Sequence, residues 1–299
     1  MSKNYLRIAA FLSLFAASVS ATAIEAVDGV YQIGTPQELT EFASLVNGGE
    51  ASINAVLTAD IDMGGAEWEC PISGVSPVIG GARYYHGTFD GQGHTISNLT
   101  IKGKYNSVNC GGLFGLGSAS AVMKNLIVRD CDFTALYSIG GIAGEWYGMM
   151  ENCASINVQI SGSNEHGLIG YGGEVKNSYT TYKNVGTAGS TTVTNCYGAD
   201  DLEEADYASG KLCYLLNGDQ SSIVWYQNVG EDAYPVLDAS RGQVVKNEDG
   251  TYGTLTGIET PSDLNAERQE SVIYNLKGQR VEKAVKGLYI MGGKKVLVK

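Results

Sequence analysis

The chain has 299 residues, a formal net charge of −12 and a calculated isoelectric point near 4.7. Such an acidic chain is repelled by phosphate backbones, so we expect no nucleic-acid partner. Forty glycines alongside 43% apolar residues indicate many tight turns between short strands, and not a disordered chain.

The first 23 residues have the pattern of an export signal peptide. Lys3 and Arg7 precede an apolar stretch at residues 8–17, and Ala-Thr-Ala at residues 21–23 provides a cleavage site before Ile24. The stretch is shorter than the roughly 20 residues of a spanning helix, so we expect no transmembrane segment. Cleavage removes two cations and no acids, which moves the net charge from −12 to −14.

A short strand at residues 30–33 is followed by signals for a helix. Thr35, Pro36 and Glu38 supply an N-cap, a first-turn proline and a capping-box glutamate. Apolar residues then recur at helical spacing, and glycines 48 and 49 end the helix. We expect this small helix to cover the open end of a stack of strands. The apolar positions are Leu39, Phe42, Ala43 and Val46.

A repeated unit follows, in which a glycine-rich apolar turn precedes an asparagine within an alternating apolar stretch. Successive asparagines lie 27, 27, 25 and 18 residues apart, which is typical of a solenoid. The apolar residues alternate with a period of two, so the repeats form strands and not helices. The sequence therefore predicts an all-β fold, a right-handed parallel β-helix over residues 24–200. The asparagines are Asn98, Asn125, Asn152, Asn177 and Asn195.

We interpret these asparagines as a structural ladder, because asparagine tolerates left-handed turns and carries both donors and an acceptor. The shared register predicts that the first four stack in one column. The residues that follow them, Leu99, Leu126, Cys153 and Ser178, would form the next column.

The segment Gly-Thr-Phe-Asp-Gly-Gln-Gly-His-Thr-Ile at residues 87–96 resembles the opening coil of surface β-helix proteins. Gly-Gly-Leu-Phe-Gly at 111–115 and Gly-Gly-Ile-Ala-Gly at 140–144 resemble the GLUG motif of that family. The likeness covers about residues 30–200 and implies a cell-surface β-helix.

Residues 201–240 change character and predict a C-terminal cap with a short helix between residues 202 and 216. The six cysteines are spread along the chain, so a disulfide scaffold is not required, although an exported chain allows disulfides. We expect Cys153 and Cys196 to be buried and not bridged to each other, because a coil holding Ser178 separates them.

Residues 241–299 predict a β-hairpin linker and a short, sandwich-like terminal segment. Tyr-Asn-Leu-Lys-Gly-Gln-Arg-Val at 274–281, Lys-Gly-Leu-Tyr-Ile at 286–290 and the Lys-Lys-Val-Leu-Val end closely resemble the C-terminal sorting signal of the type IX secretion system. That resemblance implies translocation across the outer membrane, followed by surface attachment or release. With the N-terminal signal, it predicts an extracellular or outer-surface location and export machinery as a partner.

Catalytic chemistry has little support in the sequence. The pairs Asp60/Asp62 and Asp130/Asp132 each project from one side of a strand, but no further acid joins them from the next coil, as a glycosidase pair requires. The three histidines have no partners at metal or nucleophile spacing. We assign no catalytic residue, metal or cofactor, and whether the chain is an enzyme stays open, with binding favoured.

Binding is supported by eighteen tyrosines, because aromatic faces stack on sugar rings and dominate recognition surfaces. Trp146 and Tyr147 follow one glycine-rich turn and Tyr171 follows the next, so we predict one exposed aromatic patch on adjacent coils. The competing interpretation is that these residues only cover the surface or fill a corner. The favoured function is adhesin-like recognition of a glycan or host surface. A structural surface-layer protein and a polysaccharide-active lyase or glycosidase are the alternatives.

Overall fold

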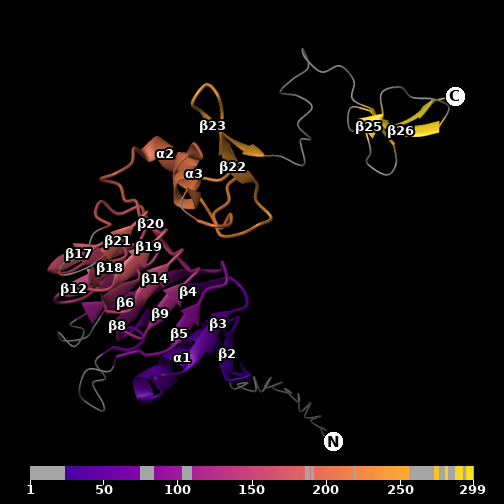
Figure 1. The fold of residues 1–299 in the computed structure, drawn as a ribbon. Helices are drawn as coiled ribbons and strands as arrows, with labels where there is room; N and C mark the ends of the chain where they lie inside the picture. The colour runs from indigo at the N-terminus through magenta and orange to yellow at the C-terminus, as the bar shows by residue number, and fades with distance from the viewer. Residues whose placement is uncertain are drawn as a thin grey trace, which may run out of the picture.

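The computed structural model describes residues 24–74, 84–102, 110–185, 189, 192–218 and 220–255, and the backbone of four strands between 273 and 298. The predicted signal peptide at residues 1–23 lies outside these residues. The described chain is mostly strands with few helices, and its larger sheets are parallel, in agreement with the predicted all-β class (Figure 1).

The largest sheet shows how the chain is organised. Each pass of the chain adds one strand beside the previous one, and every pair after the first is parallel. Phe89, Met123, Met150 and Val175 occupy the same position on successive passes. In order, the strands are β1 (Ala26–Val27), β2 (Val30–Ile33), β3 (Asn54–Leu57), β5 (Thr88–Asp90), β9 (Val122–Lys124), β14 (Met149–Glu151), β19 (Glu174–Lys176) and β21 (Thr192–Thr194).

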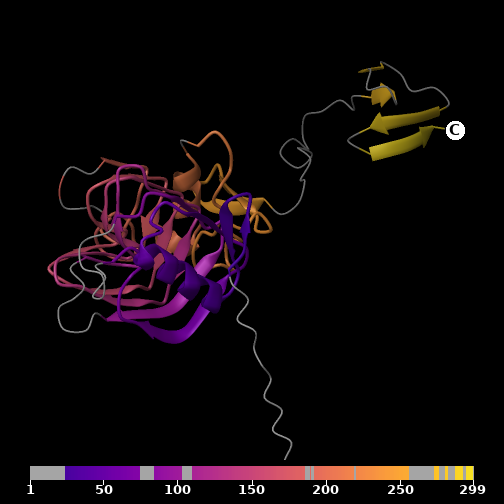
Figure 2. The same ribbon diagram turned by 90° about the horizontal axis from the view of Figure 1, so that it is seen from below.

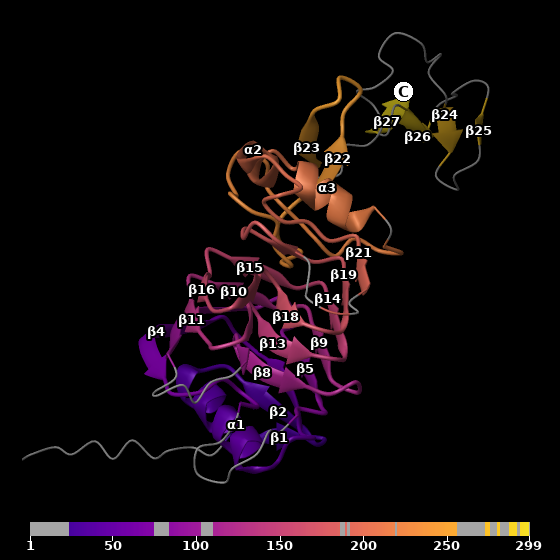
Figure 3. The same cartoon turned by 90° about the vertical axis from the view of Figure 1, so that its left-hand side faces the viewer.

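Three further sheets are built by the same passes, and all of their pairs are parallel (Figure 3). In the seven-stranded sheet the strand order is β16 (Gln159–Ser161), β11 (Asp132–Thr134), β6 (Thr95–Lys102), β10 (Ile127–Arg129), β15 (Ala154–Ile156) and β20 (Tyr179–Thr180). The seventh strand, β4 (Ile61–Trp68), also pairs with β6. One three-stranded sheet holds β7 (Cys110–Gly111), β12 (Ser138–Gly140) and β17 (Asn164–His166). The other holds β8 (Phe114–Gly117), β13 (Ala143–Trp146) and β18 (Ile169–Tyr171).

The core lies between these sheets and is continuous along the stack. Phe89, Phe114 and Trp146 are fully buried, with ring centroids 5.2 Å apart for the first pair and 5.5 Å for the second. Alternate residues of each strand face inward, so every pass contributes apolar side chains to the same core. Burial of this apolar surface is the main force that holds the passes together.

The asparagine turns have the predicted left-handed backbone. Asn98, Asn125, Asn152, Asn177 and Asn195 all have φ between 48° and 56°. The last four lie directly after the aligned strand ends of β9, β14, β19 and β21, so they form one column. Within it, Asn195 Nδ2 donates to Asn177 Oδ1 over 2.9 Å.

The predicted place of Asn98 in that column is wrong. Ser97 pairs with Arg129 and Thr100 with Asp132, which sets Asn98 opposite Asp130 and Leu99 opposite Cys131. The error arose because the pass from Phe89 to Met123 is 34 residues long, whereas the pass from Met123 to Met150 is 27. Asn98 therefore belongs to a second left-handed column with Asp130 and Asn157, whose φ values are 52° and 53°.

The predicted helix is α1 (Pro36–Gly48), and it lies at the N-terminal end of the stack (Figures 2 and 3). Thr35 is its N-cap, and Glu38 Oε2 accepts from the Gly34 N–H over 2.8 Å. The four apolar residues predicted to face inward are its buried residues. Phe42 reaches the core, 5.7 Å from the Phe89 ring, so the helix closes the open end.

The C-terminal end is closed by a second apolar cluster around Trp225. The helices α2 (Glu204–Ala208) and α3 (Lys211–Asn217) belong to it, as does Val244 of the hairpin β22 (Gln243–Lys246) and β23 (Tyr252–Leu255). Trp225 Nε1 donates to the Asn177 carbonyl over 3.0 Å, which anchors this cap to the last passes. The hairpin predicted as part of the terminal segment thus packs on the cap.

The terminal strands form one antiparallel sheet in the order β25 (Arg280–Val281), β24 (Ile273–Asn275), β26 (Gly287–Met291), β27 (Lys294–Val298). β24 pairs antiparallel with β25, and β26 pairs antiparallel with β27. Within the described strands this sheet pairs with no other.

Candidate binding site

Three tyrosines line up on the outside of the sheet formed by β8, β13 and β18. Tyr147 lies between Tyr84 and Tyr171, and each neighbouring pair of ring centroids is 6.1 Å apart. Tyr147 is 42% exposed and Tyr171 36%. We call these residues the tyrosine row. It brings together side chains from three passes of the chain.

Strand ends and glycines position the row. Tyr171 ends β18, and Tyr147 follows β13 directly, with its N–H donating to the Gly117 carbonyl over 2.9 Å. Gly172 has a φ of +80°, and a Cβ there would lie 3.1 Å from the Tyr147 ring. Gly189, with a φ of +92°, lies against the Tyr171 ring, where a Cβ would approach to 2.8 Å. Glycine at both positions leaves room for the rings.

Trp146 is not part of the exposed patch that the sequence predicted. Its side chain is fully buried, and its Nε1 donates to the Met149 carbonyl over 3.2 Å. Residues 146 and 147 point to opposite sides of the same extended segment, so only one of them can reach solvent. The core takes the larger, more apolar ring, and Tyr147 faces outward.

Tyr84 was missed by the sequence reasoning. Its neighbour Tyr85 is fully buried and bridges to Gly117, which turns Tyr84 outward. The available signal was the adjacent aromatic pair Tyr84-Tyr85 shortly before Gly87. It matches Trp146-Tyr147 before Gly148, with the buried and exposed members in reversed order.

A carboxylate lies beside the row. Glu145 aligns with Tyr171 on the next pass, and its Oε1 accepts from the Cys110 thiol over 3.2 Å. Desolvation and the negative charge of Glu145 raise the pKa values of Tyr84 and Tyr147, so both hydroxyls stay protonated at neutral pH. The site thus offers flat ring faces, hydroxyl donors and a carboxylate acceptor, which is what a polyol needs for binding.

The paired aspartates of the sequence are held by hydrogen bonds or ion pairs. Asp62 accepts from Asn98 Nδ2 over 2.8 Å and from the Gly64 N–H, and these hydrogen bonds lower its pKa. Asp130 accepts from Asn157 Nδ2, and Asp132 pairs with Lys102 at 2.7 Å. In the described part of the chain, no group of three or more acids, histidines or cysteines is placed to hold a metal ion.

The cysteines are free thiols. Cys153 is buried as expected, whereas Cys196 is partly exposed. Ser178 lies between them: the Cys153 N–H donates to Ser178 Oγ, and the Tyr197 N–H donates to the Ser178 carbonyl. This order of passes is the one that the repeat predicted.

Among the described residues, no helix is long and apolar enough to cross a membrane.

Comparison with known proteins gives one partial likeness. The chain is 31% identical over 150 residues to Halomucin of Haloquadratum walsbyi, a match that covers 46% of this chain and 2% of that protein. The chain thus corresponds to a small fraction of the length of this curated relative. No family model matches the chain. No solved structure matches it significantly.

Proposed function

We propose that this chain is an exported, surface-located binding protein that recognises carbohydrate through the tyrosine row, presented on a right-handed parallel β-helix. The observation that carries the proposal is the row itself: three partly exposed tyrosine rings from separate passes, 6.1 Å apart, beside Glu145. Single exposed aromatics are common, but three partly exposed rings grouped beside a carboxylate provide the clustered aromatic surface on which recognition depends.

The scaffold proposal is supported by the parallel registers. Four sheets receive strands from successive passes, all paired in parallel apart from β1 and β2, and both ends of the stack carry caps. Stacked passes of this kind belong to solenoids, which present extended surfaces to ligands. The export and sorting proposals rest on the signal pattern at residues 1–23 and on the resemblance of the C-terminal segment to type IX sorting signals.

A glycan array probed with the chain starting at Ile24 tests the proposal, followed by calorimetry on the strongest ligand. Removing one stacking ring by Tyr147→Ala or Tyr171→Ala should weaken binding about tenfold, because a recognition aromatic contributes more than about 1 kcal/mol. Tyr137→Ala is the matched control, since Tyr137 is 59% exposed and stands outside the row. An array without hits, or a ligand that binds the row variants at full strength, contradicts the proposal.

A further inference from the structure

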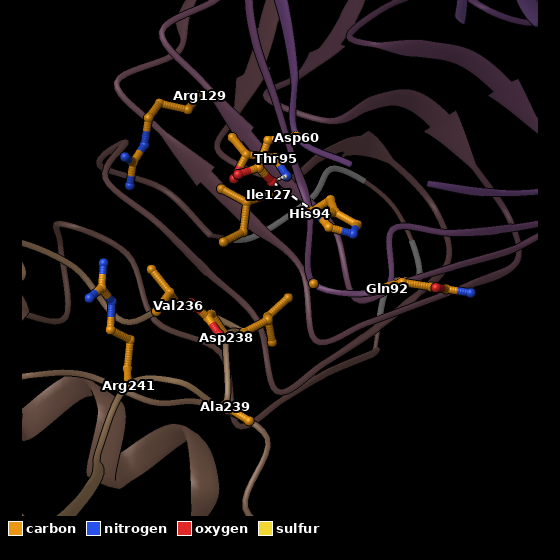
Figure 4. A pocket seen from close by; sticks show the side chains of 12 residues that line it. Asp60, Gln92, His94, Thr95, Ile127, Arg129, Val236, Asp238, Ala239 and Arg241 are labelled. Carbon is orange, nitrogen blue, oxygen red and sulfur yellow. Dashed lines mark hydrogen bonds and ion pairs between the residues drawn. The ribbon is translucent and has the colours of Figure 1, made fainter. Parts of the chain in front are cut away.

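A cavity of about 600 Å³ lies where the seven-stranded sheet meets the C-terminal cap (Figure 4). One wall is formed by the turn at residues 92–95 and by β10, and the other by residues 236–241 of the cap. Gly93 allows the two walls to approach, because a Cβ there would lie 3.0 Å from the Leu237 carbonyl oxygen. Ligand cavities often form at such junctions between separately built parts of a chain.

Two arginines line this cavity from opposite walls. Arg129 ends β10, and Arg241 comes from the cap 112 positions later in the sequence. Their guanidinium groups point toward each other in Figure 4. These are the only arginines whose side chains the structure describes, in a chain of net charge −12. A cavity lined by two positively charged side chains is therefore an exception in this acidic chain.

The arginines have unused hydrogen-bonding capacity. Arg129 Nε is buried and has no partner among the described residues, and the guanidinium lies 5.8 Å from the Tyr234 ring centroid. Arg241 forms an ion pair with Asp232, with Nε 3.6 Å from Oδ2, which is beyond ordinary hydrogen-bond length, and its side chain is 43% exposed. Because Nε of Arg129 is closed to solvent, a ligand in the cavity would be bound by the other N–H groups of the Arg129 guanidinium.

The carboxylates that line the cavity are already engaged. Asp60 Oδ1 accepts from the Thr95 N–H over 2.9 Å and lies 3.2 Å from His94 Nδ1. Asp238 accepts from the Ser240 N–H over 2.8 Å and from its hydroxyl over 2.6 Å. Neither forms an ion pair with Arg129 in the described chain, so the guanidinium is left for an external anion.

We propose that Arg129 and Arg241 bind the carboxylate of an acidic monosaccharide unit in this cavity. A planar guanidinium matches a carboxylate with two parallel hydrogen bonds, and two such groups hold one anion from both sides. Thr95 also lines the cavity, and its hydroxyl suits a hydroxyl of a sugar ring. The site belongs to a different sheet from the tyrosine row and does not depend on it.

Calorimetric titration of the chain starting at Ile24 with D-glucuronate tests this site. D-Glucose is the matched probe, because it has the same ring without the carboxylate, and inorganic sulfate serves as a competing anion. We expect glucuronate to bind and glucose to bind at least tenfold more weakly. We also expect sulfate to compete and added salt to weaken binding. Equal binding of glucose and glucuronate, or no binding of glucuronate, overturns the proposal.

Arg129→Gln and Arg241→Gln should each weaken glucuronate binding at least tenfold. Lys102→Gln is the charge-matched control: Lys102 is 57% exposed, pairs with Asp132 and does not line the cavity, so its loss should leave binding unchanged. If Arg129→Gln unfolds, the half-exposed Arg241 still provides the test. Glucuronate affinity that survives in Arg241→Gln, or falls equally in Lys102→Gln, would overturn the assignment.

Discussion

At the scale of single residues, neighbouring side chains of one extended segment have opposite roles. Trp146 fills the core between Phe114 and Tyr85, whereas Tyr147 lies in the exposed tyrosine row. A strand directs successive side chains to opposite faces, so the two aromatic rings contribute to different properties. One stabilises the fold, and the other is available to a ligand.

Truncation of these two residues should separate those properties. Trp146→Ala should lower the free energy of unfolding by about 3–5 kcal/mol, because it removes a fully buried ring and leaves a cavity. Tyr147→Ala, at a surface position, should change it by less than about 1 kcal/mol. Urea denaturation of both variants measures the difference. Equal losses would mean that the burial of the two rings is misassigned.

At the scale of elements, the turns between strands depend on left-handed residues in register. Asn125 has a φ of 52°, and its Nδ2 donates to Asp90 Oδ1 of the previous pass over 3.0 Å. The side chain thus does two things: it tolerates the backbone conformation and it links adjacent passes. The same column continues through Asn152, Asn177 and Asn195.

Two substitutions of Asn125 distinguish these contributions. Asn125→Ala should destabilise the fold by about 1–3 kcal/mol, since it loses the hydrogen bond and alanine tolerates the left-handed backbone less well than asparagine does. Asn125→Gly loses the same hydrogen bond without that strain, and should be about 1 kcal/mol more stable than the alanine variant. Thermal or urea unfolding gives the comparison. A glycine variant less stable than the alanine variant would show that backbone conformation is not the main constraint.

At the scale of the whole molecule, buried thiols predict the response to high pH. Desolvation raises the pKa of Cys153, Cys213 and Cys110 to about 12, and that of Cys131 and Cys196 to about 11, from an ordinary value of 9.0. Between pH 9 and 12 the unfolded chain therefore loses protons that the folded chain keeps. The contribution of these thiols to the free energy of unfolding should therefore be constant below pH 9, and the free energy of unfolding should fall progressively above pH 9.

Unfolding curves at pH 8, 10 and 11 measure this dependence. Cys153→Ala should flatten it, because its fully buried thiol no longer contributes to the difference in bound protons. The partly exposed Cys70 supplies a control through Cys70→Ala, which should flatten it less. Stability that is constant up to pH 11 would contradict the burial of these thiols.

The second prediction at the scale of the whole molecule concerns the terminal sheet. Its strands β24–β27 pair only with each other among the described strands, and both caps of the stack lie outside it. A chain ending at Gly257 should therefore stay folded and β-rich by circular dichroism. If the segment is a sorting signal, fractionation should find this shorter chain in the periplasm. Aggregation would mean that the segment seals the stack, and normal surface delivery would contradict its role as a signal.

The sequence by itself determined those features that depend on a few neighbouring residues. Thr35, Pro36 and Glu38 mark the start of α1, because capping and proline geometry act within one turn. The asparagines mark left-handed turns because steric limits on φ belong to single residues. Period-two apolar patterns predicted the all-β class, because the alternation of side chains is a property of a single strand, and the repeated unit predicted the parallel passes.

Only the tertiary structure decided features that depend on the summed length of whole passes. Asn98 aligns with Asp130 and not with Asn125, because the intervening pass is longer than the others. The inward position of Trp146 follows from the space between sheets, since either ring of the Trp146-Tyr147 pair satisfies the local pattern. Arg129 and Arg241 line the same cavity because the cap folds back on the seven-stranded sheet. No local pattern encodes a cavity shared by residues 112 positions apart, because it arises only when both parts have packed.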